Sequence, residues 1–199
     1  MPYTYTNRQG KTYYIRAAET KKGGVRYYLT ASADFPDLID EVPTGFEVAE
    51  LPEDARVVIR KRVPVLVTQE EKEIVQDAIA EFSAIKDFFI HAERDTLFVY
   101  HSQFNHTGGQ EENLSREEAK AGWGAEIERW MKFDTALKFV LADKAKRLFQ
   151  AERVVFTSAY GFDFHPIGQP GQIEDVAREF GQHLGRPSFF EIDPVGWEE

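Results

Sequence analysis

Asp163 and His165 are an acid and a histidine separated by a single residue. Alternate side chains of a β-strand point to the same face, so an extended backbone would place the two groups side by side. A carboxylate that orients an imidazole can make it a general base. The competing interpretation, which the sequence favours, is a surface pair beside Pro166. Asp163 and His165 are therefore the candidates for catalysis, and no complete catalytic set is predicted.

Other kinds of catalytic or metal site lack their residue patterns. The chain has no cysteine, which excludes disulfides, thiolate metal sites, iron–sulfur clusters and a cysteine nucleophile. None of its histidines forms the i, i+4 pair of a helical zinc site. Phosphate-loop, dinucleotide-binding and serine-elbow motifs are also missing. We therefore expect no cofactor and no metal, and the sequence favours a protein without enzymatic activity.

The strongest signal is a concentration of positive charge at the N-terminus. The whole chain has a formal net charge of −10. Its first 30 residues nevertheless contain six basic residues and one acid, a net charge of +5, which leaves −15 for the rest. Because phosphate binding depends on positive charge, the composition of this segment suits an anionic partner.

Residues 11–31 predict a β-hairpin with two distinct faces. If position 16 lies opposite position 26, two arginines face each other, which is unfavourable unless an anion or an acidic partner lies between them. Arginine beside aromatic rings on a sheet is also the composition of surfaces that bind single-stranded nucleic acid. A second basic strand, residues 56–62, would extend the surface. The candidate ligand-binding residues are Tyr14, Arg16, Arg26, Tyr28, Arg60 and Arg62.

The same hairpin face has a structural alternative. Its tyrosine rings would be buried against a neighbouring layer, while the arginine stems extend to water. The sequence favours this burial over a ligand, and it contains no recognised nucleic-acid-binding motif.

Three functions remain open from the sequence. The first is a non-enzymatic protein that binds an anionic partner, either nucleic acid or an acidic protein surface, through the N-terminal hairpin. The second is an enzyme of unknown reaction with a polar site near the loop 102–114 and the pair Asp163 and His165. The third is a homo-oligomeric scaffold or interaction protein.

The elements that must position these residues follow from hydrophobic periodicity and turn residues. Capping boxes at Thr68 and Ser115 open two of the predicted helices. The helical spacing of Trp123 and Trp130 indicates that both are core residues. Helices are predicted at 69–85, 115–133 and 173–184. Strands are predicted at 3–7, 11–18, 25–31, 46–49, 56–62, 88–92, 96–101, 133–141, 148–157 and 189–192.

Hairpins joined by single helices indicate an α+β fold, with a mostly antiparallel sheet and about three helices packed on one face. The length suits a single domain over 1–199, with 1–65 as a candidate β-rich N-terminal subdomain and 66–199 as the α+β main body. Neither a secretory signal nor a long apolar segment is visible, so we expect a cytoplasmic protein without a membrane partner.

The segment Asn7 to Tyr14, followed by Thr20 to Gly23 and Arg26 to Tyr28, resembles the opening of an uncharacterised group of bacterial hypothetical proteins. The later segments Leu137 to Val140 and Ser188 to Glu191 are similar to the C-terminal half of the same group. This resemblance implies no activity, cofactor or catalytic residue.

Overall fold

The computed structural model describes residues 1–105, 112–157 and 161–196, and it divides the chain into two compact units. The N-terminal unit comprises Met1–Val63 and Ala125–Lys132, and the C-terminal unit comprises Pro64–Gly124 and Phe133–Glu199. Antiparallel sheets and helices make up the described chain, which confirms the predicted α+β class.

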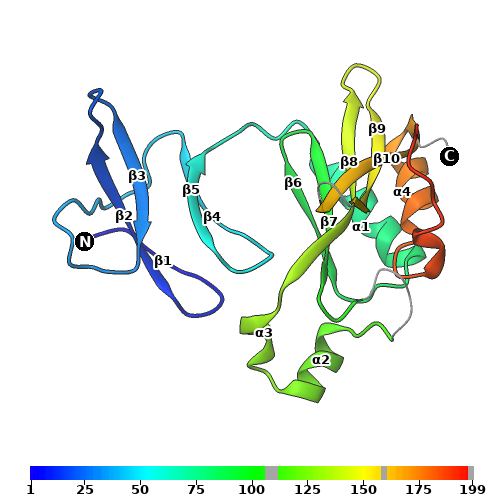
Figure 1. The fold of residues 1–199 in the computed structure, drawn as a ribbon, viewed down its shortest axis with the longest axis horizontal. Coiled ribbons are helices and arrows are strands. Elements are labelled where there is room, and N and C mark those ends of the chain that lie inside the picture. The colour runs from blue at the N-terminus through cyan, green and yellow to red at the C-terminus, as the bar shows by residue number, and fades with distance from the viewer. Residues whose placement is uncertain (106–111, 158–160, 197–199) are drawn as a thin grey trace. The chain divides into compact units, whose positions relative to one another are not determined.

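The N-terminal unit contains two small antiparallel sheets (Figure 1). Glycines in the left-handed region allow its tight turns, as at Gly10 and Gly23 with φ of 81° and 77°. Three strands form one sheet in chain order: β1 (Thr4–Thr6), β2 (Thr12–Glu19) and β3 (Val25–Thr30). The other sheet pairs β4 (Phe46–Glu50) with β5 (Val57–Lys61). These five strands agree with the predicted ones.

One face of the β2–β3 hairpin supplies the core of this unit. Ile15 is fully buried, and Tyr27 meets Phe46 of β4 edge-on with 5.0 Å between ring centroids. The unit also includes the short helix α3 (Ile127–Trp130), from the middle of the chain. Arg8 fixes this segment, because its guanidinium donates to the carbonyl oxygen of Met131 at 3.0 Å and forms an ion pair with Glu50.

The C-terminal unit is a five-stranded antiparallel sheet in the order β10-β9-β8-β7-β6, with α1 and α4 against one face (Figure 1). The apolar stripes of both helices and the inner positions of the strands form its core. The strands are β6 (Phe88–Glu93), β7 (Thr96–Ser102), β8 (Phe133–Asp143), β9 (Leu148–Thr157) and β10 (Gly161–Gly171). The helices are α1 (Gln69–Phe82), α2 (Arg116–Trp123), α4 (Ile173–Gly181) and the 3₁₀ turn Pro187–Phe189.

Both predicted capping boxes are present, at Thr68 with Glu71 and at Ser115 with Glu118. The predicted helix 115–133 is wrong in its second half, because α2 ends at Trp123. Gly124 follows with φ of 86°, a conformation that a helix cannot continue through. The prediction that the tryptophans are core residues is also wrong, since Trp123 and Trp130 are both 59% exposed.

Strand β10 was not predicted, because Pro166, Gly168 and Pro170 interrupt its pattern. Proline is tolerated there because β10 is an edge strand, whose outward positions need no N–H for the ladder. The predicted strand 189–192 is wrong: Pro187–Phe189 forms a 3₁₀ turn that buries Phe189 completely. None of the helices in the described part of the chain has the length and apolar character that a membrane span requires.

Candidate functional site

The predicted face of the β2–β3 hairpin exists, but its register differs from the prediction. Arg16 lies opposite Tyr28, and Arg26 lies opposite Ala18. The expected Arg16–Arg26 pair is therefore wrong. The turn is centred on Lys22, and Gly23 and Gly24 bond back to Thr20. A shift of two residues preserves side-chain parity, so the four predicted residues share one face. They are Tyr14, Arg16, Arg26 and Tyr28.

Arg16 has its counter-ion within the chain. Its Nε and Nη2 donate to the two carboxylate oxygens of Asp37 at 2.8 and 2.9 Å, and its guanidinium lies over the ring of Phe35 at 3.6 Å from the centroid. The hydrogen bonds from Arg16 lower the pKa of Asp37. Backbone pairing of residues 37–39 with β2 holds Asp37 in place. No external anion is needed at Arg16.

Arg60 is compensated in the same way, because it pairs across β4 and β5 with Glu47 at 2.8 Å. Arg62 follows β5 and is exposed. The predicted surface is thus partly neutralised: Arg16 and Arg60 form bonds within the unit, whereas Arg26 and Arg62 make no ion pair with any described residue.

The tip of the hairpin carries three cations that remain available. Lys21, Lys22 and Arg26 are exposed, and none of them forms an ion pair within the ranges 1–105, 112–157 and 161–196. Arg26 lies 5.9 Å from the centre of the Tyr28 ring, which is 45% exposed. The alternative that this face is buried under another layer is therefore wrong for Arg26 and Tyr28.

Charge is divided unevenly between the two units. The N-terminal unit holds twelve basic and eleven acidic residues, a net charge of +1, which leaves −11 for the C-terminal unit. Electrostatic attraction of an anion therefore favours the N-terminal unit, and within it the hairpin tip.

Asp163 and His165 lie on β10 at alternate positions, so they share a face as predicted. The Asp163 carboxylate accepts the backbone N–H of Phe164 at 2.8 Å. His165 pairs in register with Arg153, whose Nε donates to the carbonyl oxygen of Ile192 at 2.7 Å. No hydrogen bond joins Asp163 to His165 in the described structure. Asp163 instead caps a backbone group on an edge strand.

A buried polar cluster at the base of the loop 102–114 was not predicted. Its centre is Asn105, whose amide oxygen accepts the backbone N–H groups of Lys86 and Asp87 and whose amide nitrogen donates to Ser102 and Leu114. The buried polar members are Asp87, His101, Ser102, Asn105 and Asn113. Through Asn105 the cluster joins Ser102 and Leu114, the two ends of the loop. Residues 106–111, including His106, lie outside the described residues.

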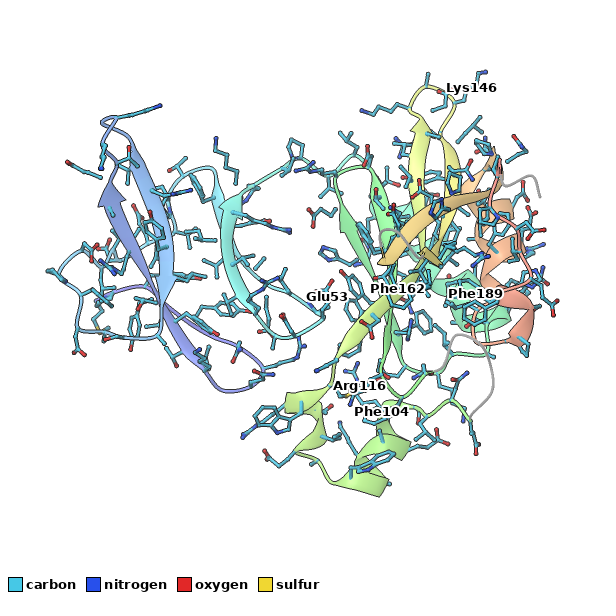
Figure 2. The ribbon with its side chains drawn as sticks, viewed as in Figure 1. Glu53, Phe104, Arg116, Lys146, Phe162 and Phe189 are labelled. Atoms are coloured by element: carbon cyan, nitrogen blue, oxygen red, sulfur yellow. The ribbon has the colours of Figure 1, made fainter. Side chains whose placement is uncertain are left out.

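Asp87 and Arg116 form the ionic part of this cluster. Arg116, which is labelled in Figure 2, is the first residue of α2. Arg116 Nη2 donates to Asp87 Oδ1 at 2.9 Å, whereas Asp87 Oδ2 and Arg116 Nε are buried without a hydrogen-bond partner among the described residues. Isolated polar residues in separate elements gave no sequence signal for this pair. No group of three or more potential metal ligands occurs in the described chain.

The sheet face opposite α1 and α4 is aromatic. Phe89 stacks on Tyr100 and meets Phe133 edge-on, each at 5.2 Å between centroids. At the other end of the sheet, Phe156 and Phe162 pair at 5.2 Å and are 65% and 77% exposed (Figure 2). Phe89 with Tyr100 and Phe156 with Phe162 are direct cross-strand pairs, and such aromatic pairs stabilise a sheet.

No protein-family model, curated protein or solved structure matches the chain. The resemblance to bacterial hypothetical proteins stays a prediction.

Proposed function

We propose that this chain is a non-enzymatic binding protein that recognises nucleic acid through the β2–β3 hairpin. The observation that carries the proposal is the group of exposed cations at the hairpin tip, Lys21, Lys22 and Arg26, next to the exposed ring of Tyr28. Lysine and arginine supply most of the affinity of such complexes by displacing counter-ions from phosphates.

The residues proposed to contact phosphate differ from those expected from the sequence. Arg16 and Arg60 are bound to Asp37 and Glu47, so neither is free to exchange its partner without losing an ion pair. They position the sheet, and the contacts to phosphate are assigned to the tip. The enzyme alternative has less support, because Asp163 bonds to its neighbouring backbone rather than to His165.

Salt dependence gives the proposal a magnitude. Each phosphate contact on a single strand contributes about −0.7 to the slope of log K against log salt concentration. Three contacts predict a slope of about −2, which lowers the affinity roughly 20-fold between about 50 and 200 mM salt.

The test compares two variants of the full chain by fluorescence anisotropy with labelled oligonucleotides. K21A/K22A removes two lysines from the tip of the β2–β3 hairpin. The matched control K144A/K146A removes two exposed lysines from the β8–β9 turn. We expect K21A/K22A to reduce the salt slope by about 1.4 and the control to leave it unchanged.

The proposal is overturned if wild-type protein binds no oligonucleotide at about 50 mM salt. It is also overturned if both variants change the slope equally, since binding would then reflect total charge rather than the hairpin. An acidic protein surface would become the remaining class of anionic partner.

A further inference from the structure

Two exposed aromatic residues are neighbours of Arg16. Tyr28 is its cross-strand neighbour on β3, and Phe35 stacks on it at 3.6 Å. Strand β2 runs between β3 and the segment 37–39, which pairs with it through backbone hydrogen bonds involving Ile15 and Ala17. The rings are 45% and 36% exposed. Phe35 thus lies against a guanidinium that Asp37 holds in one orientation, and Tyr28 lies opposite the same residue on β3.

This arrangement suits stacking of planar groups. Base–aromatic stacking requires rings with an exposed face, and it tolerates any base sequence because every base has a π-face. Rings fixed by their neighbours lose little conformational freedom when a ligand binds, which favours affinity. The bidentate Arg16–Asp37 pair provides that support for Phe35.

The width of the sheet argues against a duplex. A β-ribbon that reads duplex DNA enters the major groove as two strands. At Arg16, β2 has β3 on one side and the 37–39 segment on the other, so the sheet is wider than a ribbon. In a duplex the bases are already stacked on each other, and their faces are not accessible to Tyr28 and Phe35.

We propose that the ligand is single-stranded nucleic acid, whose unpaired bases stack on Tyr28 and Phe35 while Lys21, Lys22 and Arg26 contact its phosphates. This inference rests on the proposed function and assigns its substrate class. Phe35 is a new member of the site, which the sequence did not indicate because it precedes Pro36 in an irregular connection.

The experiment measures anisotropy of the full chain with two labelled probes at about 50 mM salt, an oligo(dT) strand and its oligo(dA)–oligo(dT) duplex. We expect tighter binding to the single strand. Y28A/F35A should weaken that binding at least about 30-fold, since each of the two stacked bases contributes about 1 kcal/mol or more independently. Y28F/F35Y retains both rings and should bind as the wild type does. Circular dichroism verifies that each variant folds.

Equal binding of both probes, with no effect of Y28A/F35A, would overturn the stacking proposal. The proposed function would survive that result if K21A/K22A still weakened binding. Failure of both probes to bind wild-type protein would instead refute the proposed function itself. If Y28A/F35A does not fold, the test depends on Y28F/F35Y. Weakened binding by folded Y28F/F35Y would overturn stacking. Unchanged binding by this variant, together with a preference for the single strand, would support stacking.

Discussion

Replacing Glu71 by glutamine would test the interaction that anchors the start of α1. Glu71 is 8% exposed, and the guanidinium of Arg147 donates to its Oε1 from Nε at 2.9 Å and from Nη2 at 2.6 Å. The same carboxylate accepts the backbone N–H of Thr68 at 2.7 Å as part of the capping box. E71Q keeps an acceptor for Thr68 but loses the charge that binds Arg147.

We expect E71Q to lower the free energy of unfolding by about 1–2 kcal/mol at pH 7. Charge-assisted hydrogen bonds contribute roughly 1.5–3 kcal/mol when buried, and the value is reduced here because the Arg147 side chain is 36% exposed. E71A also removes the capping acceptor and should cost about 1 kcal/mol more. Urea denaturation followed by circular dichroism measures both changes.

The effect of E71Q should depend on pH. Burial raises the pKa of Glu71, but the hydrogen bonds from Arg147 and Thr68 outweigh it, so the pKa in the folded protein lies below the usual value. A depressed carboxyl pKa contributes stability that is fully present above the unfolded-state pKa of about 4.3 and is lost as the pH falls through the folded-state pKa. The stability difference between wild type and E71Q should therefore shrink in that acidic range.

The control is D77N, which removes an exposed carboxylate from the middle of the same helix. We expect it to change stability by less than about 0.5 kcal/mol. Equal losses for D77N and E71Q, or a difference between E71Q and wild type that persists unchanged at low pH, would refute the assigned role of the Glu71–Arg147 pair.

Two further predictions concern packing and the buried polar cluster. G168A should destabilise the protein by about 2–4 kcal/mol, because φ at Gly168 is +62° and the added Cβ would lie 2.3 Å from the Phe180 ring. The control is G122A, whose added Cβ would meet nothing within 4 Å, and it should be neutral or stabilising. Thermal unfolding measures both changes. N105A should lower the free energy of unfolding by roughly 2–4 kcal/mol, because it leaves buried backbone groups without hydrogen-bond partners. Amide hydrogen exchange should also accelerate at residues 112–114. Unchanged exchange at these residues would contradict the role of Asn105 at the base of the loop 102–114.

Local patterns predicted most elements because those elements depend on neighbouring residues. The capping boxes at Thr68 and Ser115 each involve residues three positions apart, so the sequence contains the whole interaction. The two faces of the β2–β3 hairpin follow from alternation alone. Strand β10 escaped prediction because its prolines are acceptable only on an edge, and edge position is a property of the assembled sheet.

The candidate site was predicted only in part, for the same reason. The sequence identified Arg26 and Tyr28 as members of the candidate site. It did not identify the partners of Arg16 and Arg60, which come from other strands and connections. Asp37 reaches Arg16 across 21 positions, and Glu47 reaches Arg60 across 13. The buried cluster around Asn105 likewise joins segments up to 29 positions apart.

The sequence by itself determined where positive charge and aromatic rings occur along the chain, and which of them share a face of the hairpin. The tertiary structure decided which of those charges are available. Pairing of residues 37–39 with β2 brings Asp37 to Arg16, and pairing of β4 with β5 brings Glu47 to Arg60. Lys21, Lys22 and Arg26 at the hairpin tip form no ion pair with any described residue. The sequence could not specify this, because an ion pair depends on distance in space rather than on residue spacing along the chain.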